Sequence, residues 1–104
     1  MYHAFVLGLL VTLEKTHEIK SNRESGFGRY DVMLIPKDSS ALGICMEFKK
    51  AQEHEDLETV AINALKQIEE KKYNRELQNR GIQDILHLGF AFQGKKVLIK
   101  QVRI

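Results

Sequence analysis

Two apolar segments joined by a short polar turn constrain the fold of this chain most strongly. The first segment, RYDVMLIP, spans residues 29–36, and the second, LGICMEFKK, spans residues 42–50. The intervening KDSSA has turn composition, and both segments are rich in apolar and β-branched side chains, so the pattern predicts a β-hairpin. Charged residues nevertheless interrupt both apolar runs: Asp31 in the first, and Glu47 with Lys49 in the second.

The simplest register of this hairpin places the two acidic residues opposite each other. If the residues that flank the turn pair with one another, Asp31 lies opposite Glu47 and Arg29 lies opposite Lys49. Because side chains alternate along a strand, these four charged groups then share one face of the hairpin. The other face is wholly apolar and consists of Val32, Leu34, Ile44, Met46 and Phe48.

Two opposed carboxylates require a compensating positive charge. Directly opposite residues have Cβ atoms about 4.5–5.5 Å apart, and two carboxylates this close do not both ionise unaided. Asp31, Glu47, the backbone carbonyl of Phe48 and water form the all-oxygen set that suits Mg²⁺, or Mn²⁺ in its place. Lys49 would then orient or deprotonate a water, or stabilise developing negative charge, which suits phosphodiester hydrolysis.

An exposed strand face with an ordinary ion pair is the alternative interpretation. Asp31 and Lys49 would then form a cross-strand salt bridge in water, and no metal would be needed. Glu24, just before the glycine turn SGFG at residues 25–28, has two interpretations as well. It is either a third acid for the metal or a solvated charge at the end of a strand.

The remaining segments alternate between helical and strand-like patterns. Apolar spacing predicts helices over residues 2–13 and 53–73, and Lys71 at the end of the second suits the helix dipole. Strands are predicted at three further places, residues 16–24, 82–92 and 95–104. The order helix, three strands, helix, two strands predicts an α/β (α+β) fold with a mixed sheet, whose polar first strand lies at an edge.

Length and composition favour a single domain over residues 1–104. The chain is 43% hydrophobic and 29% charged, as is usual for a globular protein, and has no apolar run long enough to span a membrane. Its one cysteine, Cys45, fits a small core residue and a reducing, cytoplasmic compartment. A net charge of +2 permits nucleic-acid binding without requiring it. The first helix begins at Met1 without a capping residue, which predicts a piece of a longer or trimmed chain.

The pattern resembles the PD-(D/E)XK nuclease superfamily, whose restriction-endonuclease-like core is αβββαβ. Asp31 matches the superfamily's aspartate, and EFK at residues 47–49 matches its E-x-K motif, although Tyr30 replaces the usual preceding proline. Together with YHAFVLGLL, SNRESGFGRYDVMLIP and HLGFAF, these motifs resemble a more specific group. That group is the nuclease-like domain at the C-terminal end of bacterial AAA-ATPase-like proteins, and the resemblance covers nearly the whole chain. No ATPase portion lies within these residues.

The resemblance adds candidate residues and partners. His3 would stand where related nucleases carry an acidic metal ligand, and partial burial in the core is the alternative. Gln67 lies where the superfamily has a helical glutamine near the active site, and Arg29, opposite Lys49, would contact a phosphate. The resemblance also implies a DNA substrate, a homodimer that cuts two strands, and attachment to an ATPase domain.

The leading interpretation is a metal-dependent endonuclease or exonuclease in which Asp31, Glu47 and Lys49 are catalytic. A chain of this size has little room for a base-reading element, so recognition directed by DNA ends or structure is predicted. One alternative is a non-catalytic module that keeps the nuclease fold and binds nucleic acid or a protein. Another is a structural domain that pairs with itself. The intact Asp–Glu–Lys set favours the enzyme, because a scaffold has little reason to oppose two acids.

Overall fold

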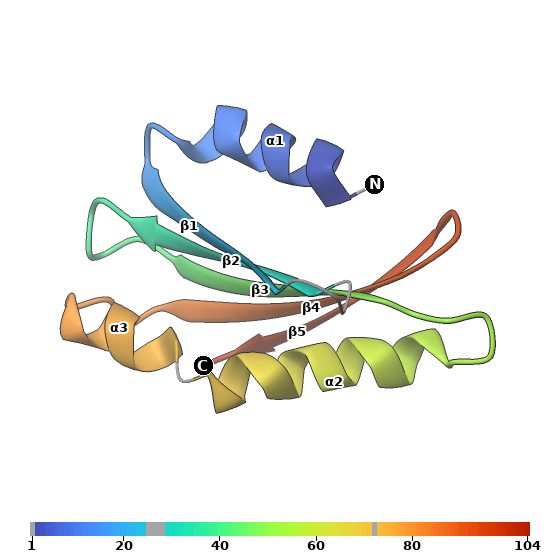
Figure 1. The fold of residues 1–104 in the computed structure, drawn as a ribbon. Helices are drawn as coiled ribbons and strands as arrows, with labels where there is room; N and C mark the ends of the chain where they lie inside the picture. The colour runs from blue at the N-terminus through green and yellow to red at the C-terminus, as the bar shows by residue number, and fades with distance from the viewer. Residues whose placement is uncertain (1, 25–28, 72) are drawn as a thin grey trace.

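A five-stranded sheet with helices on both faces forms the framework of the molecule in a computed structural model (Figure 1). The structure describes residues 2–24, 29–71 and 73–104. In chain order the elements are α1 (Tyr2–Leu13), β1 (His17–Glu24), β2 (Arg29–Pro36), β3 (Gly43–Lys50), α2 (Leu57–Glu70), α3 (Tyr73–Asn79), β4 (Ile85–Gln93) and β5 (Lys96–Arg103). Helix α1 lies on one face of the sheet, and α2 and α3 lie on the other.

The strands lie in the sheet in the same order as in the chain. Neighbouring strands are antiparallel except β3 and β4, which are parallel. Helices α2 and α3 connect these two strands and return the chain to the end of the sheet where β3 begins. The predicted α+β class, the mixed sheet and the edge position of β1 are therefore confirmed. The hairpin register is confirmed as well, since Asp31 lies opposite Glu47 and Arg29 lies opposite Lys49.

Both faces of the hairpin are buried. The wholly apolar face packs with Phe90 and Phe92 of β4 and with Leu9 and Leu13 of α1. The opposite face, which carries the charged residues, packs against α2 and α3. Its core consists of Met33, Ile35, Cys45, Ile68, Leu77, Ile82 and Ile85. Cys45 is a buried core residue, as predicted.

The single helix predicted over residues 53–73 is wrong at both ends. Asp56 caps α2 by accepting a hydrogen bond from the Thr59 backbone N–H at 3.2 Å, so the preceding acids lie outside the helix. The separate helix α3 was not predicted, and buried Leu77 anchors it to the core. Among the described side chains of α1, Val11 is 77% exposed, so the helix is not covered on every side.

Gly89 on β4 lets α2 approach the sheet beside Glu47. Gly89 and Glu47 are neighbours in the β3–β4 register. A Cβ atom at residue 89 would collide with the carbonyl oxygen of Ala61 and would lie 3.0 Å from the backbone nitrogen of Leu65. Only glycine therefore allows this contact between the α2 backbone and the sheet. None of the helices in the described ranges has the length and apolar character needed to cross a bilayer.

Candidate active site

Asp31 and Glu47 form a buried pair of acids at the centre of the sheet. Asp31 is 4% exposed and Glu47 is fully buried, and both lie on the face that α2 and α3 cover. The alternative of a water-exposed strand face is therefore wrong. Burying two carboxylates together is costly unless hydrogen bonds and a cation compensate for the lost hydration.

Lys71 supplies a cation to both acids. Its Nζ atom donates to Asp31 Oδ2 at 2.6 Å and to Glu47 Oε1 at 3.1 Å. Lys71 is the C-cap residue of α2, and its backbone N–H donates to the carbonyls of Gln67 and Glu69. The helix end thus holds the root of the side chain while the ammonium group lies between two strands. The sequence predicted a favourable interaction of Lys71 with the helix dipole, but the main contact of its side chain is with the two acids.

Lys49 and Phe48 keep the strand positions that the register predicts. Lys49 lies two residues after Glu47, so its side chain leaves the sheet on the same face, where it is half-buried. Phe48 turns its side chain to the opposite face, where its ring centroid lies 4.7 Å from that of Phe90. The carbonyl of Phe48 belongs to a strand with neighbours on both sides, β2 and β4.

Gln67 lies one helical turn before Lys71 on α2. The side chain is partly buried, and its Oε1 atom is buried with no hydrogen-bond partner within the described residues. A buried acceptor without a partner is costly and unusual in a folded protein. This oxygen is therefore available for a ligand, one helical turn before the lysine that bonds to both acids.

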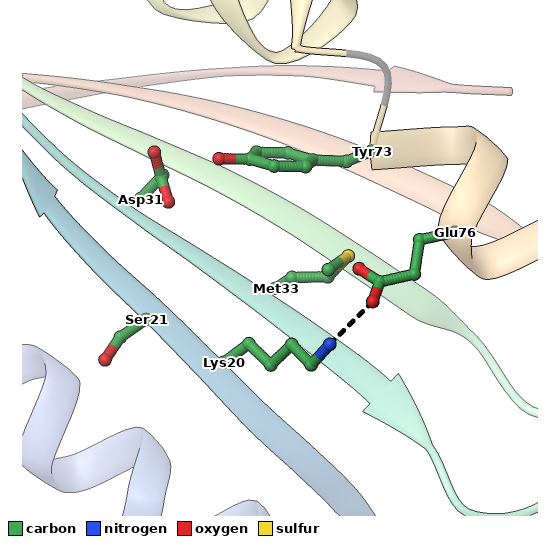
Figure 2. Close-up of a pocket in the computed structure, with 6 residues that line it drawn as sticks. All are labelled: Lys20, Ser21, Asp31, Met33, Tyr73 and Glu76. Carbon is green, nitrogen blue, oxygen red and sulfur yellow. Dashed lines mark hydrogen bonds and ion pairs between the residues drawn. The ribbon is translucent and has the colours of Figure 1, made fainter.

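Tyr73, the first residue of α3, directs its hydroxyl group toward Asp31 (Figure 2). Burial raises the pKa of the Tyr73 hydroxyl, and a hydrogen bond to the Asp31 carboxylate raises it further. The hydroxyl therefore stays protonated at neutral pH and acts as a donor to the acid. An interpretation of Tyr73 as simple packing at a helix end omits this contact.

A pocket of about 380 Å³ opens beside Asp31 (Figure 2). Two strands and one helix line it, with Lys20 and Ser21 from β1, Asp31 and Met33 from β2, and Tyr73 and Glu76 from α3. Lys20 Nζ lies 2.6 Å from Glu76 Oε1, and this ion pair joins the two walls of the pocket. The pocket connects the acid pair with the surface of the molecule.

Three predicted site residues lie outside the described side chains, namely His3, Glu24 and Arg29. The glycine turn at residues 25–28 also lies outside the described residues. Within the described ranges, no group of three or more His, Cys, Asp or Glu side chains could hold a metal. The described acidic part of the site is therefore the pair Asp31 and Glu47.

Two of the described histidines bond to neighbouring polar groups in the fold. His17 bonds to the Thr16 hydroxyl and to the Leu42 carbonyl, both at 2.9 Å. His87 is buried and bonds to Asn74 Oδ1 at 2.6 Å. His54 is exposed in the turn that precedes α2, where helix-start acids explain its surroundings.

Sequence reasoning missed the roles of Lys71 and Tyr73. Both residues lie at the junction of α2 and α3, where the sequence EEKKYNRE has no apolar periodicity to place a side chain on a face. One signal was available, because two opposed buried acids need a nearby basic side chain. Lys71 is one of several lysines that could have met that need, so the sequence did not single it out.

Comparison with known proteins agrees with this geometry. The sequence model of the PD-(D/E)XK nuclease superfamily matches residues 1–102. No curated protein and no solved structure matches the chain. Members of this superfamily generally use divalent metal ions, and the mixed sheet with flanking helices is consistent with their restriction-endonuclease-like fold. The chain therefore belongs to the PD-(D/E)XK nuclease superfamily, and this membership suggests nuclease activity.

Proposed function

We propose that this protein is a metal-dependent nuclease that hydrolyses phosphodiester bonds in DNA. The catalytic residues in this proposal are Asp31, Glu47 and Lys49. One observation carries the proposal: two buried carboxylates lie opposite each other and hold a cationic group between them. Two acids buried side by side are costly unless a cation lies between them, and a nuclease uses such a pair to hold its metal.

The residues fit a hard divalent cation. Asp31 and Glu47 provide carboxylate oxygens, and Gln67 Oε1 is a buried amide oxygen without a partner in the described part of the chain. The ammonium group of Lys71 already stands in for a cation at this place. Mg²⁺ or Mn²⁺ bound here would polarise a phosphodiester oxygen and lower the pKa of a bound water. Phe48 through its carbonyl, Glu24 and His3 stay candidate ligands.

The chain's own side chains have separate roles in the proposed reaction. Asp31 and Glu47 hold the cation, and Tyr73 keeps the Asp31 carboxylate oriented by donating a hydrogen bond. Lys49, on the same face as Glu47, donates to the attacking water or to a phosphate oxygen. Arg29, opposite Lys49 in the register, contacts a neighbouring phosphate.

Binding of a metal requires Lys71 to release the acids. The two cations repel each other and use the same carboxylate oxygens, so they compete for the site. The Lys71 side chain is 22% exposed and follows the last turn of α2, so its ammonium group has a route to water. A bound divalent metal ion would therefore replace the single positive charge of Lys71 at the acids with a double positive charge.

The proposed substrate is DNA whose ends or local structure, rather than base sequence, direct cleavage. Both endonuclease and exonuclease action fit the site. Cutting both strands of a duplex would require a homodimer or two binding events. Attachment to an ATPase domain in a longer chain is a further part of this proposal.

Isothermal titration calorimetry with Mg²⁺ and with Mn²⁺ tests the metal site directly. We expect the wild-type protein to bind either ion and Glu47→Gln to bind neither. Glu58→Gln is the matched control, because Glu58 is an exposed α2 glutamate that pairs with Lys100 at 3.1 Å. Cleavage assays on blunt, branched and single-stranded DNA would follow. Absence of metal binding by the wild type, even with DNA present, would overturn the proposal.

A non-catalytic binding module is the second candidate, and the Lys71 contacts favour it. The ammonium group already bonds to both acids, so the pair has a cationic partner without a metal. This module would bind nucleic acid or protein without turnover. The same titration separates the two candidates, because the module would show no metal binding in wild type or variant.

A further inference from the structure

The pocket beside Asp31 has the properties of a site for one unpaired nucleotide. We propose that it takes the base and sugar of a nucleotide that adjoins the scissile phosphate, so the preferred substrate has an unpaired position at the cleavage site. This inference rests on the proposed function, since it names the substrate class of the same site.

The position of the pocket links the surface to the acid pair. Asp31 lies at its buried end, whereas Lys20 and Glu76 have side chains that are 44% and 38% exposed. Figure 2 shows the side chains of Tyr73 and Met33 between these two ends. Tyr73 and Met33 therefore line the space between the exposed end and Asp31.

The size of the pocket selects a single nucleotide. Its volume of about 380 Å³ lies within the range of small-ligand pockets, about 300–1,000 Å³. A double helix is too wide to enter such a space between a strand pair and a helix. A nucleotide that is not held in a base pair can rotate out of the helix and enter it.

The lining suits a base better than a phosphate. Tyr73 offers an aromatic ring and Met33 a polarisable thioether, and flat bases stack on such groups. Lys20 donates hydrogen bonds, whereas Glu76 accepts them. The one ammonium group in the lining, that of Lys20, is already paired with Glu76 at 2.6 Å, so the lining offers a phosphate little attraction. The phosphate would instead lie at the buried end, where Asp31 belongs both to the pocket and to the proposed metal site.

The test is equilibrium binding of three fluorescently labelled DNAs, measured by anisotropy in Ca²⁺, an oxygen-seeking cation used to keep the DNA intact. The DNAs are a blunt duplex, the same duplex with one unpaired nucleotide, and a single strand. We expect the wild type to bind the two DNAs with unpaired nucleotides about 5- to 150-fold more tightly than the blunt duplex, as one base–aromatic stack provides. Tyr73→Phe should keep this preference and Tyr73→Ala should lose it.

Lys20→Ala provides a second test that does not disturb the core. It should reduce the preference several-fold, whereas Lys100→Ala should not. The two lysines are matched, because each is partly exposed on an edge strand and pairs with a helical glutamate. Equal affinity of the wild type for blunt and unpaired DNA would overturn the inference. A preference that survives both Tyr73→Ala and Lys20→Ala would also overturn the inference. If Tyr73→Ala fails to fold, a preference that survives Lys20→Ala alone would overturn it.

Metal calorimetry separates failure of this inference from failure of the proposed function. If the wild type binds Mg²⁺ and cleaves blunt and unpaired DNA equally, the inference is wrong and the nuclease proposal stands. If the wild type binds no metal, the proposed function is wrong and the inference falls with it. Lys20→Ala should bind Mg²⁺ like the wild type, since Lys20 lies at the outer end of the pocket.

Discussion

The ammonium group of Lys71 lies 2.6 Å from Asp31 Oδ2, although 40 residues separate the two in the sequence. The same group also bonds to Glu47, so one lysine at the end of α2 holds acids from two strands. This relationship ties the stability of the fold to the chemistry of the site, because any metal must displace an ion pair that already stabilises the protein.

Replacement of Lys71 by methionine should weaken the fold and strengthen metal binding. Loss of the ammonium group removes the cation that bonds to both buried carboxylates. The free energy of unfolding in metal-free buffer should fall by about 2–4 kcal/mol, a value discounted for the partial exposure of Lys71. Removal of the competitor should raise Mg²⁺ affinity about tenfold, equivalent to about 1.4 kcal/mol. Urea unfolding and calorimetry measure the two effects.

Lys66→Met is the matched control for this prediction. Lys66 is an exposed lysine of α2. Its replacement should change the unfolding free energy by no more than about 0.5 kcal/mol and should leave the metal affinity unchanged. If Lys71→Met were as stable as Lys66→Met, the ion pairs of Lys71 would contribute nothing, and competition with the metal would be refuted.

Gly89→Ala should destabilise the protein and displace α2. The new methyl group would collide with the Ala61 carbonyl oxygen, so the helix must move away from the sheet beside Glu47. We expect a loss of about 1–3 kcal/mol in urea unfolding. Gly8→Ala is the control, because nothing lies within 4 Å of a Cβ atom at Gly8 and alanine favours a helix by about 0.5–1 kcal/mol. Equal stability of the two variants would contradict the close contact.

His87 should make the protein less stable below about pH 6.5. Burial lowers the pKa of His87 from its ordinary value of 6.5 and outweighs the opposing effect of Glu69. The unfolded chain therefore binds a proton before the folded protein does, so stability is complete above pH 6.5 and falls as the pH drops toward the folded pKa. Urea unfolding at several pH values measures this slope.

Two variants identify the histidine responsible. His87→Gln should flatten the slope below about pH 6.5, because the buried titrating group is gone. His54→Gln removes an exposed histidine and should leave the slope as in the wild type. An unchanged slope in His87→Gln would assign the acid sensitivity to other groups.

Cys45 should resist alkylation in the folded protein. Burial raises the pKa of the Cys45 thiol to about 12, and the nearby Glu76 and Asp31 carboxylates contribute to the increase. The thiolate is the reactive form, so iodoacetamide at neutral pH should label Cys45 only when the protein unfolds. Mass spectrometry with and without urea measures the rates. Rapid labelling without urea would show that this part of the core opens readily.

The hairpin and its opposed acids could be predicted from sequence because two constraints agree there. Alternating apolar residues define the faces, the turn fixes the register, and a shift by one residue would turn the apolar set outward. The burial of the charged face could not be predicted from the same pattern, since it depends on the cover that α2 and α3 provide.

Helix α3 and the position of Lys71 depend on tertiary contacts. In the sequence YNRELQN, only Tyr73 and Leu77 are apolar, a single pair that gives no helical periodicity. Lys71 reaches the acids from the end of a helix whose backbone lies close to the sheet at Gly89, and a glycine in a strand predicts close approach without naming what approaches. Gln67 was placed near the site by resemblance, and the structure places it one turn before Lys71.

The positions of Asp31, Glu47 and Lys71 in the sequence also bear on the order of folding. Asp31 and Glu47 belong to one hairpin and can meet through a short loop, whereas Lys71 arrives only when α2 docks. The early hairpin therefore brings like charges together before their partner is present. Its formation should speed up when acid protonates one carboxylate or when salt screens the pair. The refolding rate thus carries an electrostatic barrier that the finished structure no longer contains.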